Sequence, residues 1–138
     1  MAAGKVWLVG AGPGDIVGKR ANHHTMVQED INKVLLEEAE KGNKVVRLKG
    51  GDPFLFGRGG EELELLSENG IPYEIVPGVT SPISVPAYNG IPVTHRDFCS
   101  SLHIITGHKR AGQEYDIDFK ALTQTKGTLV FLMGIAAL

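Results

Sequence analysis

The sequence predicts an α/β fold in which a mostly parallel sheet is flanked by helices. Short apolar segments alternate with amphipathic segments along the 138 residues, and each apolar segment is bounded by glycine or proline. The 18 glycines and 7 prolines gather just after these apolar segments. Strands that alternate with helices are typical of a sheet covered on both faces, and glycine loops at strand ends let a ligand approach the backbone. A hydrophobic content of 42% is enough for a compact core.

Five segments are predicted to be strands because they are short, apolar and end at turn-forming residues. These strands are Lys5–Val9, Lys44–Leu48, Tyr73–Val76, Leu102–Thr106 and Thr128–Met133. Residues 10–27, which connect the first strand to the first helix, form an 18-residue stretch with little pattern. Loops longer than about 12 to 15 residues are uncommon in compact domains, so this stretch is either functional or lacks a segment.

The segments between the strands are predicted to be helices. In the first predicted helix, apolar residues recur every three or four positions, and Gly42 ends this helix as a C-cap. Gly70 ends the second predicted helix in the same way. Glu61 and Glu62 fall in the first turn of the second helix, where acidic groups favour the positive end of the helix dipole. The predicted helices are Gln28–Lys41, Gly60–Asn69, Thr80–Tyr88 and Phe119–Leu122.

Composition and charge exclude several classes of protein. A formal net charge of −2 provides no global basic field for nucleic acid or an anionic membrane. The lone cysteine, Cys99, excludes an intrachain disulfide framework and a multi-cysteine zinc site, and it indicates a reducing compartment. The N-terminus lacks the pattern of a signal peptide, and the longest apolar run, Leu129–Leu138, is about half of the roughly 20 residues that cross a bilayer. We therefore expect a cytoplasmic protein that spans no membrane.

The glycines after the first strand fit the common nucleotide motifs poorly. The third glycine, Gly14, comes two residues after the second, and Pro13 removes a backbone donor, so the dinucleotide fingerprint is not met. A phosphate loop fails as well, because Arg20 stands where a magnesium-binding Ser or Thr is needed. The five histidines match no named zinc spacing, and Cys99 is more typical of a small buried residue than of a nucleophile.

The loops after the second and third strands are more distinctive. The paired glycines Gly50 and Gly51 expose backbone groups beside Asp52, whose carboxylate can bind a hydroxyl or an ammonium group or can simply start a turn. Arg58 stands between glycines near a helix start, which suits bidentate carboxylate binding, although an ordinary surface arginine fits equally well. The hydroxyls of the third loop, between Pro77 and Pro82, include one that helix capping alone explains.

Four segments of the sequence, taken together, resemble the tetrapyrrole methylase family. They are Val9–Asp15, Arg47–Glu62, Pro77–Arg96 and Thr106–His108, and the resemblance covers nearly the whole chain. It implies the family's N-terminal lobe and an enzyme that transfers methyl groups from S-adenosylmethionine to two carbons of uroporphyrinogen III. The products would be precorrin-2, on the route to sirohaem and cobalamin, and S-adenosylhomocysteine. It also implies a homodimer with no metal.

The resemblance also implies particular site residues. S-adenosylmethionine would be contacted by Pro13, Gly50, Gly51, Asp52, Leu55, Thr80, Ser81 and Met133. The tetrapyrrole would be faced by Arg58, Glu61, Arg96 and Met133. Catalytic roles would fall to Lys19, as a proton donor, and to Arg58 and Arg96. The substrate's eight carboxylates would find further cations at Lys49 and Lys109.

The sequence departs from the family pattern at two places. The resemblance implies an N-terminal lobe over residues 1–127 that lacks an internal segment between Asp15 and Ile16, and a truncated start of a second lobe over residues 128–138. The alternatives to the predicted activity are methylation of another precorrin and an inactive remnant that only binds ligand. A nucleotide-binding module is a further alternative, and titration with NAD or ATP would reveal it.

Overall fold

The computed structural model describes residues 3–10, 26–107 and 117–134. It divides into two compact units, Met1–Thr80 and Ser81–Leu138. The first unit contains β1 (Lys5–Gly10), α1 (Gln28–Glu40), β2 (Lys44–Lys49), α2 (Gly59–Glu68) and β3 (Tyr73–Val76), and the second contains α3 (Ser81–Tyr88), β4 (Leu102–Thr106), α4 (Phe119–Gln124) and β5 (Thr128–Leu132). The predicted strands and helices are confirmed, with their ends displaced by one or two residues.

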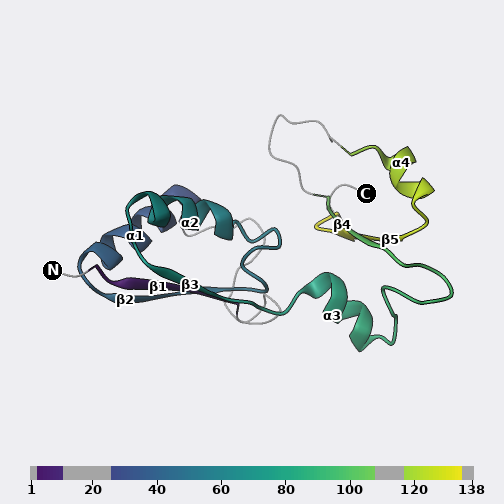
Figure 1. The fold of residues 1–138 in the computed structure, drawn as a ribbon, viewed down its shortest axis with the longest axis horizontal. Coiled ribbons are helices and arrows are strands. Elements are labelled where there is room, and N and C mark those ends of the chain that lie inside the picture. Colours follow the sequence, from purple (N-terminus) through teal and green to yellow (C-terminus); the bar gives the residue numbers. More distant parts are fainter. Residues whose placement is uncertain (1–2, 11–25, 108–116, 135–138) are drawn as a thin grey trace. The chain divides into compact units, whose positions relative to one another are not determined.

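The first unit is built on a three-stranded parallel sheet in the order β2-β1-β3. The central strand β1 pairs with both neighbours, so that Val6 lies opposite Val45 on one side and Tyr73 on the other. Helices α1 and α2 both cover the same face of this sheet (Figure 1). On the other face, which no described helix of this unit covers, Val46 and Leu48 are 63% and 47% exposed. Because the strands are parallel, their carboxyl ends meet at one edge of the sheet.

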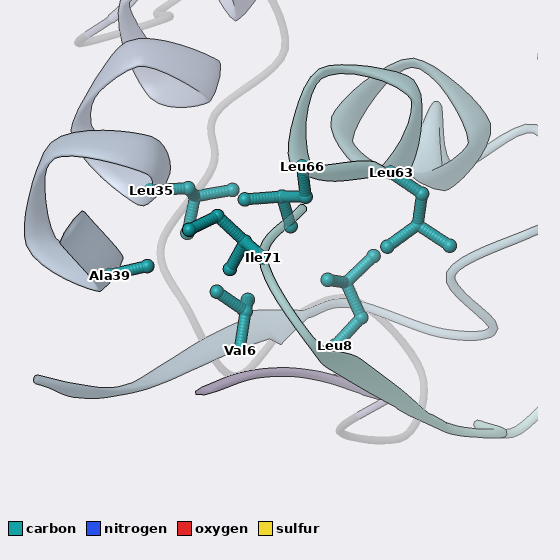
Figure 2. Packing of buried hydrophobic residues seen from close by; sticks show 7 residues of the cluster. All are labelled: Val6, Leu8, Leu35, Ala39, Leu63, Leu66 and Ile71. Atoms are coloured by element: carbon teal, nitrogen blue, oxygen red, sulfur yellow. The ribbon is translucent and has the colours of Figure 1, made fainter. Parts of the chain in front are cut away.

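The core of the first unit lies between the sheet and its two helices. Alternation along β1 sends Val6 and Leu8 inward, and both are fully buried. They pack against apolar residues of both helices, and within each helix these residues are three or four positions apart. Figure 2 shows these side chains converging from α1, α2, β1 and the segment before β3: Val6, Leu8, Leu35, Ala39, Leu63, Leu66 and Ile71.

The predicted C-caps are confirmed by backbone geometry. Gly42 follows α1 with φ 84° and Gly70 follows α2 with φ 66°, both in the left-handed region that glycine adopts without a Cβ penalty. The Gly42 amide donates to the carbonyl of Ala39 at 3.0 Å, which satisfies one of the orphan acceptors of the helix end.

The second unit contains a parallel pair of strands, β4 and β5, with α4 between them in the chain. Helix α3 contacts β5 and carries Pro86 within its span. Helix α4 begins at a capping residue, since the Asp118 carboxylate accepts a hydrogen bond from the Ala121 amide at 2.9 Å. None of the helices among the described residues is long and apolar enough to cross a membrane.

Lys126, two residues after α4, has φ 54° and is exposed. We expect Lys126→Gly to raise the free energy of unfolding by about 0.5–1 kcal/mol, because glycine removes the Cβ penalty of a left-handed backbone. Lys120→Gly, within α4, is the matched control and should lower it by about 1 kcal/mol. Urea titration followed by far-ultraviolet circular dichroism measures both, and equal destabilisation by the two changes would contradict the assignment.

Candidate active site at the strand ends of the first unit

The end of β1 and the loops after β2 and β3 approach one another backbone to backbone. A Cβ placed on Gly10 would lie 2.3 Å from the Gly78 Cα and 2.7 Å from the Gly51 carbonyl oxygen. Gly51 itself has φ 80°, which reserves its position for glycine. These three glycines therefore form a seam, the glycine seam, in which main chain from all three strand ends is brought together without intervening side chains. Such a seam offers backbone donors and acceptors to a ligand at the carboxyl edge of a parallel sheet.

Asp52 links two of these loops through both of its carboxylate oxygens. Oδ1 accepts hydrogen bonds from the amides of Phe54 at 2.9 Å and Leu55 at 3.2 Å, while Oδ2 accepts from the Gly78 amide at 3.2 Å. The amide of Phe54 and, to a smaller degree, those of Gly78 and Leu55 lower the pKa of Asp52, against the opposing effect of burial. These bonds confirm the interpretation of Asp52 as a turn residue, and its role in ligand binding stays a prediction.

The chain between Asp52 and α2 follows an unusual path. Phe56 and Arg58 both have left-handed backbones, with φ 54° and 57°, although neither is glycine. Pro53 is fully buried, and its carbonyl oxygen accepts a hydrogen bond from the Gly59 amide at 3.0 Å. Bulky residues in this region of φ/ψ space cost of order 1–3 kcal/mol each and cluster at functional sites. The sequence contained no signal for this strain.

Arg58 makes a bidentate ion pair with Glu61, a neighbour at the start of the same helix, and its predicted binding of a ligand carboxylate stays a prediction. Nε and Nη2 of Arg58 donate to Oε1 and Oε2 of Glu61 at 2.8 and 2.5 Å. The hydrogen bond to Glu61 raises the pKa of Arg58 above its ordinary value, although burial acts in the other direction. Both side chains are about half exposed, so the pair is accessible to a carboxylate ligand and contributes little to stability.

Lys49 does not have the substrate-facing position that the sequence predicted. It is 8% exposed, and its Nζ lies 2.8 Å from Oε1 of the fully buried Glu62. Lys49 points inward because β2 alternates, so that Val45, Arg47 and Lys49 share the face that packs under the helices. The alternation of β2 places Lys49 on the inner face, and a buried lysine indicates a buried acidic partner. The sequence interpretation missed this partner because it assigned Glu62 only to the helix dipole.

The remaining predicted site residues fall in three places. Gly50, Leu55 and Thr80 belong to the loops of the first unit, beside the glycine seam. Ser81, the exposed Arg96 and Met133 belong to the second unit, where Met133 follows β5 with φ 55°. Pro13, Lys19, Lys109 and the junction between residues 15 and 16 lie outside the described residues. The division into lobes at residues 127 and 128 stays a prediction.

The second unit repeats the backbone approach at its own strand ends. A Cβ on Gly107, directly after β4, would lie 2.5 Å from the Cα of Gly134, and the Gly107 amide donates to the Leu132 carbonyl at 2.6 Å. Met133 therefore stands next to a second close contact of main chain. Within the described part of the chain, no group of three or more His, Cys, Asp or Glu side chains could hold a metal ion.

Comparison with known proteins decides the family. The model of the tetrapyrrole (corrin/porphyrin) methylases matches residues 15–138. The chain belongs to the tetrapyrrole methylase family. This finding confirms the resemblance drawn from the four sequence segments, and it matches the parallel strands flanked by helices that the structure contains.

Curated relatives of this methylase chain are much longer than it is. A porphyrin biosynthesis protein HemD of Ruminiclostridium josui is 62% identical over 122 residues, which are 88% of this chain and 24% of that protein. A sirohaem synthase of Escherichia coli is 57% identical over 119 residues, which are 86% of this chain and 26% of that protein. The chain thus spans about a quarter of the length of these relatives.

Solved structures show the same fold. A uroporphyrin-III C-methyltransferase of Thermus thermophilus, complexed with S-adenosyl homocysteine, matches with a TM-score of 0.73 and 34% identity over 96% of this chain and 67% of that one. A cobalt precorrin-4 methyltransferase matches with a TM-score of 0.75 at 23% identity, covering 94% of this chain and 68% of that one, and it bears on the fold alone.

Proposed function

We propose that this chain provides the cofactor-binding part of an S-adenosylmethionine-dependent methyltransferase that converts uroporphyrinogen III to precorrin-2. The observation that carries the proposal is the glycine seam, because Gly10, Gly51 and Gly78 leave only main chain at the meeting point of three strand ends. The Thermus relative that is complexed with S-adenosyl homocysteine supports the choice of cofactor. Its name and those of the sirohaem and porphyrin biosynthesis relatives support the choice of substrate.

The residues of the seam fit such a cofactor. S-adenosylmethionine carries ribose hydroxyls, a purine edge and an amino-acid group, all of which can hydrogen-bond to backbone N–H and C=O groups. A Cβ on Gly10 or Gly78 would collide with the facing main chain, so the seam presents backbone groups rather than side chains at this edge of the sheet. In this proposal Gly50, Gly51, Leu55 and Thr80 contact the cofactor, and Asp52 holds their loops in shape. Pro13, Ser81 and Met133 complete the proposed contacts.

The chain's own residues would act mainly by alignment. When bound, S-adenosylmethionine supplies an electrophilic methyl group for in-line attack by an electron-rich pyrrole carbon. Arg58 and Arg96 bind substrate carboxylates and so orient the macrocycle, with Glu61 as the group that Arg58 releases when substrate arrives. Lys19 is the proposed proton donor. We also propose that the protein works as a homodimer in the cytoplasm, which light scattering and fractionation test.

The decisive experiment pairs binding with turnover. Titration calorimetry with S-adenosylhomocysteine should give saturable binding, and labelled S-adenosylmethionine should transfer its methyl group to uroporphyrinogen III. Binding without turnover would favour a ligand-binding remnant, and transfer only to a different precorrin would reassign the substrate. Saturable binding of NAD or ATP instead of S-adenosylhomocysteine would overturn the proposal.

Arg58→Ala is expected to raise the KM for the tetrapyrrole about 10- to 100-fold, the worth of a lost bidentate, charge-assisted contact. The affinity for S-adenosylhomocysteine should stay within about twofold, because the Arg58 guanidinium hydrogen-bonds to Glu61 rather than to the seam. Lys33→Ala, which removes an exposed pair with Glu37 on α1, is the matched control and should change neither quantity. Loss of cofactor affinity with an unchanged KM would refute the role of Arg58.

A further inference from the structure

A buried group of charged and polar side chains lies under the end of β2 that carries the glycine loop. The Glu62 side chain is fully buried, and those of Lys49 and Arg47 are 7% and 19% exposed. Three donors converge on Oε1 of Glu62: Nζ of Lys49 at 2.8 Å, Nε2 of Gln28 at 3.0 Å and Nε of Arg47 at 3.2 Å. Glu62 thereby connects α2 to both α1 and β2. We call these four residues the Glu62 cluster.

Stability alone does not account for the Glu62 cluster. Oε2 of Glu62 is buried and has no hydrogen-bond partner among the described residues. A buried carboxylate with one unsatisfied oxygen is costly, and apolar side chains of similar size in place of a buried ion pair are often neutral or stabilising. The apolar core that continues along α2, at Leu63 and Leu66, shows that such residues fit on this helix. A position that keeps a costly buried charge calls for a reason other than packing.

The position of Lys49 supplies that reason. Lys49 is the last residue of β2, so the peptide that follows it begins the loop of Gly50, Gly51 and Asp52. A contact chain runs from Glu62 to Lys49 at 2.8 Å, along the backbone to Asp52, and from the Asp52 carboxylate to the Gly78 amide at 3.2 Å. The Glu62 carboxylate is thus linked, from inside the fold, to the residue from which the glycine loop departs.

We propose that Glu62 is a positioning residue that sets the geometry of the cofactor loop through Lys49, with Arg47 and Gln28 holding its carboxylate in place. This inference rests on the proposed function, because the loop is assigned to S-adenosylmethionine there. Small displacements of groups that align reactants reduce rates steeply, about 100-fold for 1 Å. Glu62 itself touches neither ligand in this proposal and acts only through the backbone of the loop.

The test separates position from stability. The double variant Glu62→Leu with Lys49→Met removes the most buried pair of the cluster. Arg47 keeps solvent access at 19% exposure and its bond to the Leu48 carbonyl at 3.1 Å, and Gln28 keeps its bond to Asn32, so the variant should melt close to the wild-type temperature. It should bind S-adenosylhomocysteine at least tenfold more weakly, and its kcat/KM for S-adenosylmethionine should fall by at least the same factor. Ile71→Val, a loss of one methyl group in the same core, is the control for stability and should leave the affinity unchanged. Wild-type affinity in the double variant would overturn the proposal.

Glu62→Gln provides a second, milder variant if the double variant does not fold. Its amide keeps an oxygen for Lys49 but loses the charge, and an affinity loss of at least threefold is expected, whereas none would count against the proposal. Hydrogen exchange of the Gly78 amide, which bonds to Asp52, reports the loop without any ligand. If the Gly78 amide exchanges faster in Glu62→Gln than in the control Ile71→Val, the inference is supported. Equal exchange rates in the two variants overturn it. If the wild-type chain binds no S-adenosylhomocysteine, the proposed function fails, and the exchange result still decides whether Glu62 positions the loop.

Discussion

Gly78→Ala is expected to abolish S-adenosylhomocysteine binding and to lower the free energy of unfolding of the first unit by about 1–3 kcal/mol, as overpacking does in a filled interior. A Cβ at this position would lie 2.4 Å from the Gly51 carbonyl oxygen and 2.7 Å from the Gly10 Cα. Both neighbours are main-chain atoms, which cannot rotate away as a side chain does. The end of β1 and the loops after β2 and β3 must therefore separate, and the backbone surface offered to the cofactor separates with them.

Gly60→Ala is the matched control for this change. Gly60 lies in the first turn of α2, and nothing would lie within 4 Å of its added Cβ. Alanine in a helix is favoured over glycine by about 0.5–1 kcal/mol, so this variant should be slightly more stable and bind normally. Guanidinium unfolding and calorimetry measure both variants. If Gly78→Ala bound S-adenosylhomocysteine with wild-type affinity, the glycine seam would not be the cofactor site.

Asp52→Asn is expected to weaken S-adenosylhomocysteine binding about tenfold or more and to destabilise the first unit by about 1 kcal/mol, the lower end of the cost of an unsatisfied donor, because the Gly78 amide is only part-buried. The asparagine oxygen can still accept from Phe54 and Leu55, but an NH₂ group would then face the Gly78 amide, which now donates to Oδ2 at 3.2 Å. The turn would survive, whereas the link between the second and third loops would be lost. Asp52→Ala removes all three bonds and should cost more than Asp52→Asn by both measures.

The same carboxylate predicts a pH dependence. Because the amide hydrogen bonds of Phe54, Gly78 and Leu55 lower the pKa of folded Asp52, its contribution to stability is fully present above the pKa of the unfolded chain, about 3.9. That contribution is lost as the pH falls through the lower, folded pKa. Unfolding free energies measured from pH 6 down to the acid limit should therefore fall less in Asp52→Asn than in the wild type. Parallel pH profiles would show that Asp52 makes no such contribution.

Periodicity and glycine placement predicted the elements because both act locally. The alternation of β1 and the apolar spacing of α1 need only the neighbouring sequence, and Gly42 and Gly70 terminate helices wherever they occur. The meeting of Gly10 with Gly78 follows from the rule that parallel strands end at one edge, so the sequence indicated where these strand ends come together.

The parts that the sequence did not predict depend on contacts between distant segments. The buried carboxylate of Glu62 exists because the inner face of β2 ends in Lys49, 13 positions earlier. A pattern read along α2 alone assigns Glu62 to the helix start. The left-handed backbone of Phe56 is likewise imposed by the bonds that fix the loop around it, since nothing in a phenylalanine favours that conformation. The residue roles at Lys19, Arg96 and Met133 came from family resemblance and stay predictions.

The contact of Gly10 with Gly78 has an evolutionary consequence. The two residues meet through main chain alone, so no change of side-chain rotamer alters the contact, and a Cβ on either residue would collide with the other. Sequence variation beside this contact is therefore expected at exposed side chains such as Phe54 and Val79, which are 51% and 43% exposed. The main-chain contact would stay constant in descendants of this fold while the side chains around it diversify.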